Sequence, residues 1–426
     1  MNHYTTLAGQ LKEQILTFSE KLCVGISRPK LKFVAQMLFG ILKGQSVMLT
    51  DIARALCEDI TLKKTVDRLS RNCTKFNDRE KLTENYTETV KPIIDEDTIY
   101  CLDPGELVKD YSRKQGGLCK VWDSSEKKGA KGYNLVEVTA LTHKTKLPVP
   151  IYTELYSSEN GDSEGETAEI IKAINHINDN FGNKGILTKD RGMDCVEIYQ
   201  QCHNNGQKFV VRAKKNRNVI YNGETLNILD LANKFKGKIK LDHTDKHGKK
   251  HTLKMWHIPI ELPDLIGVPL TLIVVHGYDK KDPEPMLLIT NLDAAGKQKS
   301  LRVLKTYLCR WRIEEYYRFK KNQFDLENIR VMSLESIKTL NLLVSILSGW
   351  LAMFAAKRGQ SLLLERIFVE AKRVYEIPQF TLYAVADGIY EIFSKTFTGI
   401  SYAFARKPQS GQLTLLEPSR IQPWAA

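Results

Sequence analysis

The sequence predicts an α/β protein in which a helical N-terminal region precedes a mixed sheet, and a β-rich insertion interrupts that sheet. Apolar residues recur at spacings of three and four in the first part of the chain, which is the periodicity of a helix. β-branched and aromatic runs then alternate with amphipathic stretches, and helical periodicity returns after residue 298. The predicted segments are a helical domain at 1–95, the first part of an α/β core at 96–215, the β-rich insertion at 216–297, the helical part of the core at 298–360, and a C-terminal helical region and tail at 361–426.

The charge balance of the chain points to a polyanionic partner. Its 426 residues carry a formal net charge of +13, and the sequence pI is about 9.1. A protein this basic most often binds nucleic acid. General solubility is the alternative explanation of the same charge.

Cysteine usage and the N-terminus predict a cytoplasmic protein. None of the eight cysteines forms a CxxC pair, which argues against a zinc module and against a disulfide framework. The first residues, MNHYTTLAGQLKEQ, are too polar for a signal peptide. The apolar run TLNLLVSILSGWLAMFAA is nearly long enough to span a bilayer, but it carries Asn341 and is flanked by amphipathic charged helices. We predict a buried core helix there and no membrane association.

Two short helices within the N-terminal region resemble a helix-turn-helix. Thr50 is the predicted N-cap of the first, DIARAL, and a short break precedes the second, TLKKTVDRLSRN. The second helix is basic, and its cations would face a phosphate backbone. A plain helical bundle with a solvated basic face explains the pattern equally well. The candidate DNA-binding residues of this helix are Lys63, Lys64, Arg68 and Arg71.

From residue 98 the pattern is that of a sheet with helices. TIYCLD is a short predicted strand, and YNLVEVTALT and KLPVPIYTEL, separated by HKT, predict a hairpin. An amphipathic helix closes at Gly182. The strand KGILTKD, a further helix and the strand KFVVRAK follow. Three antiparallel strands and then alternating helix and strand predict a mixed sheet.

Two aspartates stand where predicted strands end. Asp103 ends TIYCLD just before a Pro-Gly pair, and Asp190 ends GILTKD just before an Arg-Gly pair. Active-site groups gather at such positions because the sheet fixes the backbone while the following turn leaves the side chain exposed. Taken singly, each aspartate is also a common turn former or helix cap.

The run YLCRWRIEEYYRFKK, residues 307–321, supplies a third acid. On a single helix, four of its residues fall on one face. The carboxylate on that face can bind a metal ion, and the hydroxyl, guanidinium and ammonium groups can bind phosphate oxygens. Its neighbour Glu315 lies about 100° round the helix and is a predicted ion-pair partner. The four residues of the face are Tyr307, Arg310, Glu314 and Lys321.

Three acids that are distant in sequence suit magnesium. Mg²⁺ prefers hard oxygen ligands and keeps several waters, so two or three carboxylates can hold one or two ions in an open site. Two such ions about 3.5–4 Å apart can activate water and stabilise a leaving oxygen in phosphodiester cleavage. The predicted metal ligands are Asp103, Asp190 and Glu314. Glu327 is a rival for the third position.

These motifs resemble the DDE transposases of bacterial insertion sequences, in the subgroup with the Y-x2-R-x3-E-x6-K signature. The spacing of the signature matches completely, YCLDPGELVKD and LTKDRGMD resemble the blocks around the family's first two acids, and RWRIEEYYRFKK resembles the block around the third. The resemblance covers roughly residues 95–345. It implies that Asp103, Asp190 and Glu314 are catalytic.

The resemblance also implies a fold, a reaction and partners. The implied fold is a ribonuclease H-like core with a β-rich insertion between the second Asp and the Glu. The implied reaction uses Mg²⁺ or Mn²⁺, as two ions: water cleaves the element end, and the freed 3′ hydroxyl attacks target DNA. The implied partners are double-stranded DNA, as terminal inverted repeats and target, and a second copy of the chain in a homodimer. The protein would be bacterial, cytoplasmic, and associated with the nucleoid when bound to DNA. The residues that would hold the DNA end are Tyr307, Arg310, Arg318 and Lys321.

Two departures from the family leave the route of second-strand cleavage open. Met193 stands where members often place an aromatic residue. Some members use a tryptophan of the insertion to stack a flipped base, but Trp256, in LKMWHIPI, gives no basis for that assignment.

Two other functions compete with active transposition: a catalytically inactive, transposase-derived DNA-binding protein, and a ribonuclease H-like nuclease. The three intact acids argue against the first, and the Tyr-Arg-Lys frame around Glu314 argues against the second.

Overall fold

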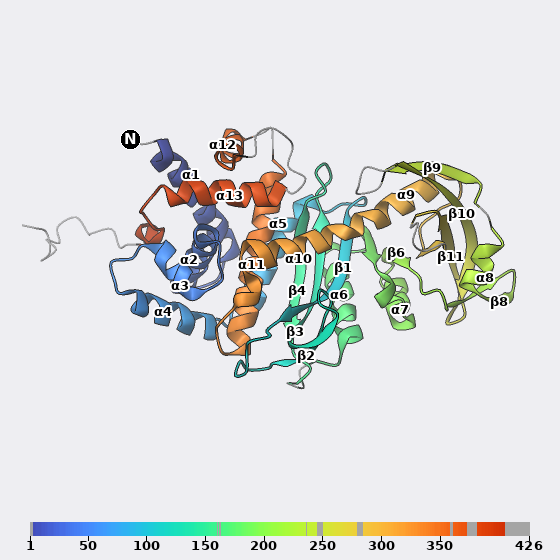
Figure 1. Ribbon diagram of the computed structural model, residues 1–426, viewed down its shortest axis with the longest axis horizontal. Coiled ribbons are helices and arrows are strands. Elements are labelled where there is room, and N and C mark those ends of the chain that lie inside the picture. The colour runs from blue at the N-terminus through green and yellow to red at the C-terminus, as the bar shows by residue number, and fades with distance from the viewer. Residues whose placement is uncertain are drawn as a thin grey trace, which may run out of the picture.

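The helices and the sheet occupy different parts of the molecule. In the computed structural model, the N-terminal and C-terminal helices gather at one end, the central sheet follows, and the β-rich segment lies at the other end (Figure 1). A helical run crosses the molecule and connects these parts. The structure describes residues 3–159, 161, 163–235, 237–244, 250–278, 284–357, 361–372 and 381–404.

The N-terminal helices share one hydrophobic core with the C-terminal ones. Apolar residues of α1 and α2 pack against α11 (Leu334–Ala355) and α13 (Thr381–Ser394). The ring of Phe39 on α2 meets that of Phe393 on α13 edge-on, with the centroids 5.0 Å apart. The predicted N-cap Thr50 is wrong: α3 begins at Leu49, two residues before the predicted start at Asp51, and Met48 is its N-cap. The N-terminal elements are α1 (His3–Leu22), α2 (Arg28–Gly44), α3 (Leu49–Leu56), α4 (Leu62–Thr74), α5 (Arg79–Val90) and the 3₁₀ turn η1 (Lys91–Ile93).

A mixed sheet follows, in the spatial order β4-β3-β1-β5-β6. β3 is antiparallel to both of its neighbours, β1 and β4, whereas β5 and β6 run parallel to β1. The predicted hairpin is confirmed as β3 and β4, and β2 is a strand that the sequence analysis missed. The elements are β1 (Ile99–Val108), β2 (Cys119–Asp123), β3 (Lys128–Leu141), β4 (Pro148–Tyr156), α6 (Glu166–Phe181), β5 (Ile186–Lys189), η2 (Arg191–Met193), α7 (Val196–Asn204) and β6 (Lys208–Arg212).

β1 is longer than the sequence predicts, so Asp103 lies within a strand and not at its end. Parallel pairing with β5 stops at Cys101, but antiparallel pairing with β3 continues on the other side of β1 as far as Val108. The Pro-Gly pair after Asp103 does not end the strand, because β3 keeps pairing with β1 through both residues. Asp190, in contrast, directly follows β5 as predicted.

The β-rich segment extends the same sheet. β12 pairs with β6, and β11, β10, β7 and β8 follow, so twelve strands among the described residues form one sheet. The segment comprises β7 (Asn218–Tyr221), β8 (Glu224–Asn227), α8 (Ile228–Asn233), β9 (Ile239–Thr244), β10 (Lys250–Leu262), β11 (Leu265–His276) and β12 (Met286–Thr290).

The signature run is not one uninterrupted α-helix. α9 ends at Leu308, a 3₁₀ turn follows, and α10 starts at Arg312. Tyr307 therefore lies on α9 and Arg310 in the turn. The run still crosses the sheet at β1 (Figure 1), and α9 contacts β5. The C-terminal elements are α9 (Lys297–Leu308), η3 (Cys309–Trp311), α10 (Arg312–Gln323), η4 (Leu326–Asn328), α11 (Leu334–Ala355), α12 (Leu362–Glu370), α13 (Thr381–Ser394) and η5 (Ser401–Phe404).

α11 is the buried core helix that the sequence predicted. Among the described residues it is the one single helix long and apolar enough to cross a membrane, but 89% of its apolar window is buried inside the protein. It packs against β4 and against the N-terminal helices. Of the predicted C-terminal helical region and tail, residues 405–426 lie outside the described residues.

Gly349 of α11 should be intolerant of any side chain. A Cβ there would lie 1.8 Å from the hydroxyl of Tyr86, which donates a 2.8 Å hydrogen bond to the carbonyl of Pro150. Overpacking a close-packed core typically costs about 1–3 kcal/mol, so Gly349→Ala is expected to lower the free energy of unfolding by that amount in urea titrations. Gly9→Ala is the matched control, because a Cβ at Gly9 meets nothing within 4 Å. Equal stability of the two variants would contradict this packing.

Candidate active site

The register of two parallel strands brings two of the acids together. Cys101 of β1 pairs with Thr188 of β5, and Asp103 and Asp190 each lie two residues further along. Side chains alternate between the faces of a strand, so Asp103 shares the face of Ile99 and Cys101. These two residues pack against Ile313 and Tyr316 of α10, so Asp103 faces the helix that carries Glu314.

The guanidinium of Arg310 joins all three acids. Its Nη1 lies 3.8 Å from Oδ1 of Asp103, and its Nη2 lies 3.9 Å from Oδ2 of Asp190 and 2.7 Å from Oε1 of Glu314. The Arg310 side chain is only 14% exposed, whereas that of Glu314 is 52% exposed. The carboxylates of Asp103 on β1, Asp190 after β5 and Glu314 on α10 therefore lie around one partly exposed position.

Burial and mutual repulsion set the charges of this cluster. Burial raises the pKa of Asp103 to about 7; Glu314 and Asp190 add to the rise and Arg310 opposes it. Burial alone would also raise the pKa of Asp190, but Arg310, a backbone hydrogen bond and Arg212 together hold it below its ordinary value. Arg212, on β6, is therefore a neighbour of the site. It begins RAKKNRN, a run in which sequence alone does not separate phosphate contact from solvation.

Two tyrosines hold the backbone and side chains of the aspartates. The Tyr307 hydroxyl donates to Oδ1 of Asp190 at 3.2 Å, and burial, then Asp190, raises the pKa of Tyr307 to about 12. The Tyr317 hydroxyl donates to the backbone carbonyl of Asp103 at 2.6 Å. Its ring passes over Gly105, where an added Cβ would lie 3.2 Å from the ring. The sequence analysis missed Tyr317, although its position three residues after Glu314 puts it on the same side of α10.

The other basic residues of the signature differ in their availability. Arg318 is exposed on α10. Lys321 pairs with Glu327 at 2.8 Å, and Glu327 thus has a partner away from the Arg310 cluster. Lys320, another base of the same run, is completely buried and cannot reach DNA. Glu315 pairs with Arg312 at 2.8 Å, which confirms its predicted role as an ion-pair partner.

The candidate DNA-binding residues of α4 likewise fall into exposed residues and a residue that other side chains of the protein hold. Lys63, Lys64 and Arg71 are exposed. Arg68 instead pairs with Glu58 at 2.5 Å and donates to Gln36 of α2 at 2.7 Å. These contacts favour a structural role for Arg68.

Trp311 is an exposed aromatic residue that the sequence analysis passed over. It directly follows Arg310, is 45% exposed, and stacks with the guanidinium of Arg312 at 4.4 Å. The sequence signal was present, because Trp311 lies inside the signature itself, whereas Trp256 is far from it in sequence.

The donor chemistry of the cluster fits a divalent cation. Three carboxylates are the hard oxygen ligands that Mg²⁺ and Mn²⁺ prefer. Burial raises the pKa of Asp103, and the neighbouring carboxylates Glu314 and Asp190 raise it further. In the conformation seen, however, no three His, Cys, Asp or Glu side chains among the described residues are placed to hold one metal ion. The guanidinium of Arg310 lies between the three carboxylates, so Arg310 and a shared metal ion would compete for the same oxygens.

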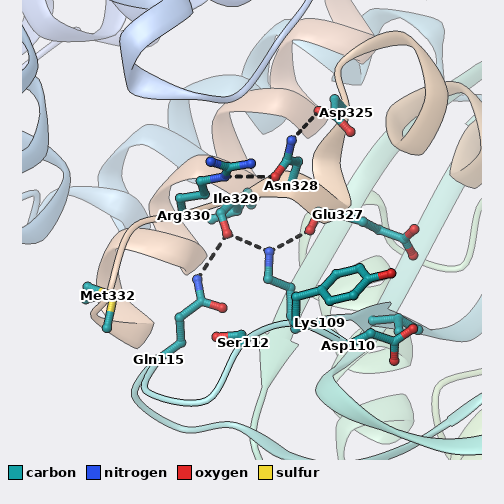
Figure 2. Close-up of a pocket in the computed structure, with 12 residues that line it drawn as sticks. Lys109, Asp110, Ser112, Gln115, Asp325, Glu327, Asn328, Ile329, Arg330 and Met332 are labelled. Carbon is teal, nitrogen blue, oxygen red and sulfur yellow. Dashed lines mark hydrogen bonds between the residues drawn. The ribbon is translucent and has the colours of Figure 1, made fainter.

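A cavity of about 720 Å³ lies where β1 ends and the α10–α11 connection passes (Figure 2). Lys109 lines this cavity. Its ammonium group donates hydrogen bonds to the backbone carbonyls of Glu327 at 2.6 Å and Ile329 at 2.5 Å. Gln115 donates to the carbonyls of Ile329 and Val331. These bonds fix the connection that follows α10.

Lys109 should give the protein a measurable pH dependence. Burial lowers the pKa of Lys109 to about 8, below the value of about 10.4 expected in the unfolded chain. Between these values the unfolded state binds more protons, so the free energy of unfolding should rise with pH. Lys109→Met should remove this part of the rise and lower stability by about 1–3 kcal/mol, because buried carbonyls lose their donor. Urea titrations from pH 8 to 10 test this against Lys114→Met, an exposed neighbour; parallel profiles for wild type and Lys109→Met would refute it.

Comparison with known proteins places the chain in a family. The family described as "Transposase DDE domain" matches residues 93–350, which include all three acids. Among solved structures, the chain is similar to "Cryo-EM structure of piggyBac transposase synaptic complex with hairpin DNA", with 10% sequence identity, coverage of 94% of this chain and 80% of that chain, and a TM-score of 0.48. A search of curated proteins finds no match. The family match spans more than half of the sequence, and the chain belongs to the transposase DDE domain family.

Proposed function

We propose that the protein is an active transposase that cleaves the ends of its own element and joins them to target DNA. One observation carries this proposal: carboxylates from β1, from the end of β5 and from α10 meet around Arg310 in a chain of this family. The three acids are separated by 87 or more residues in sequence. A merely structural role would not require three such distant acids at one partly open position.

The proposal gives each residue of the cluster a role. Asp103, Asp190 and Glu314 would hold Mg²⁺ or Mn²⁺, as two ions; when bound, the ions supply activation of water and stabilisation of the leaving oxygen. Tyr307 holds the Asp190 carboxylate through its hydroxyl. Arg310 would exchange its carboxylate contacts for a phosphate of the DNA end, which a guanidinium can bind bidentately.

The charge distribution supports a DNA partner. The net charge of +13 suits a polyanion, and Arg318, Lys63, Lys64 and Arg71 are exposed cations. We propose terminal inverted repeats and target DNA as the substrates and a homodimer as the complex that holds two ends. A bacterial insertion sequence of the Y-x2-R-x3-E-x6-K subgroup is the proposed source, with the protein in the cytoplasm and at the nucleoid.

A strand-transfer assay separates this function from its competitors. The purified protein is incubated with Mg²⁺, a DNA fragment bearing the inverted repeats that flank the gene, and a circular target. A transposase produces junctions between repeat ends and target, which sequencing identifies. Cleavage without junctions would indicate a nuclease, and binding without cleavage would indicate an inactive DNA-binding protein.

A further inference from the structure

A second charged cluster lies between α10 and β3, the strand that pairs with β1, and is completely buried in the protein. Nζ of Lys320, on α10, contacts both carboxylate oxygens of Glu137, on β3, at 2.7 and 2.9 Å. Neither residue is exposed to solvent. The same ammonium lies 3.2 Å from Oδ1 of Asn341 and 3.2 Å from Oγ of Ser345, both on α11.

The rest of this cluster satisfies the Glu137 carboxylate. The Tyr316 hydroxyl, also on α10, lies 3.2 Å from Oε1 of Glu137 and 3.0 Å from Ser345. Thr153 of β4 donates to the same oxygen and accepts from Asn341 at 2.9 Å. Four elements, α10, α11, β3 and β4, are therefore tied together through one buried carboxylate.

Glu137 occupies a particular place in the sheet. It lies directly opposite Asp103 in the pairing of β1 with β3, and residues directly opposite share a face of the sheet. α10 thus makes two polar attachments to neighbouring positions: Lys320 to Glu137, and Tyr317 to the carbonyl of Asp103. Glu314 is carried by the same helix, less than two turns before Lys320.

Stability does not account for such a pair. Replacing a buried ion pair with apolar side chains of similar volume is often neutral or stabilising, because both charges lose their hydration when buried. What a buried ion pair can provide is conformational specificity. Lys320 and Tyr316, four residues apart on α10, both contact the Glu137 carboxylate, and these two contacts together fix the position of the helix against β3. These two elements are the helix of Glu314 and the strand next to Asp103.

We propose that Glu137 and Lys320 are positioning residues of the active site, whose ion pair fixes α10 against β3 and so sets the place of Glu314 relative to Asp103. This inference rests on the proposed function, in which Asp103, Asp190 and Glu314 share a divalent cation. Neither Glu137 nor Lys320 touches that cation.

The test uses Mn²⁺ alone as the probe, with binding measured by electron paramagnetic resonance on the full chain. The variant Glu137→Gln/Lys320→Met keeps the volume of both side chains and removes both charges. It is expected to melt within a few degrees of the wild type and to bind Mn²⁺ at least about tenfold more weakly, as is typical when residues that orient metal ligands are changed. The matched control is Glu58→Gln/Arg68→Met, which removes the Arg68 pair on α4 and should leave Mn²⁺ affinity unchanged.

The outcomes separate this inference from the function on which it rests. Wild-type affinity for Mn²⁺ in a folded Glu137→Gln/Lys320→Met protein would overturn the positioning role alone. Mn²⁺ binding by the wild type that Glu314→Gln does not weaken would overturn the proposed metal site itself. If the double variant does not fold, Glu137→Asp decides: it keeps both charges but shortens the link by one methylene, so it must weaken Mn²⁺ binding, and unchanged affinity refutes the proposal.

Discussion

Glu314→Gln is expected to abolish cleavage of a DNA end and to leave binding of that end nearly unchanged. Glutamine keeps the shape of the side chain, which is half exposed on α10, but removes the charge that would hold a metal ion. Metal-ion catalysis contributes several kcal/mol to the transition state, so cleavage should fall by at least about 1,000-fold. Gel-shift and cleavage assays on the same end fragment measure the two effects separately.

Glu327→Gln is the matched control for this substitution. Glu327 is an acid of the same helical region that pairs with Lys321 and has no contact with Arg310. Its cleavage rate should stay within a few fold of wild type. Parallel loss of binding and cleavage in Glu314→Gln would show that Glu314 is structural, and a larger loss in Glu327→Gln would identify Glu327 as the third metal ligand.

Arg310→Ala is expected to change stability and DNA binding together. The guanidinium is the cation among three carboxylates, so its removal leaves them to repel one another. Because Glu314 and Asp190 are partly exposed and can be hydrated, we expect a loss of about 1–3 kcal/mol in the free energy of unfolding. If Arg310 also grips a phosphate, the log–log dependence of end binding on salt should become shallower by about 0.9.

Two further variants identify which contact is lost. Arg310→Lys keeps the charge but cannot form the forked contact, so it should recover more of the stability than of the DNA affinity. Arg312→Ala, two residues on, removes the pair with Glu315 and the stacking on Trp311, and should leave the salt slope unchanged. An unchanged slope in Arg310→Ala would limit the role of Arg310 to its contacts with the three carboxylates.

Patterns of residues close together in the sequence predicted individual strands and the spacing of the signature residues, because these depend on local interactions. Runs of β-branched and aromatic residues identified β3, β4, β5 and β6. The hydroxyl–guanidinium–carboxylate spacing of the signature identified Tyr307, Arg310 and Glu314 as neighbours. Asp190 could be placed because its strand really ends there.

Features that depend on a partner distant in sequence could not be predicted. A Pro-Gly pair normally ends a strand, but β3 pairs with β1 through it, so Asp103 is held within the sheet. In the sequence, Lys320 is one more basic residue in a basic run. Its burial is explained by its ion pair with Glu137 of β3, which is distant in sequence. The break at Arg310 likewise has no local signal, since no proline or glycine occurs in the run.

The most direct test of the central claim maps where a metal ion binds. Fe²⁺ replaces Mg²⁺ in the protein bound to a DNA end, and ascorbate with peroxide then generates radicals that cut the polypeptide beside the iron. If the three carboxylates share a metal ion, the polypeptide is cut near residues 103, 190 and 314 in the same sample, and these cuts are suppressed by excess Mg²⁺ and lost in Glu314→Gln. Cuts elsewhere, no cuts, or an unchanged pattern in Glu314→Gln would show that these three carboxylates do not share a metal ion.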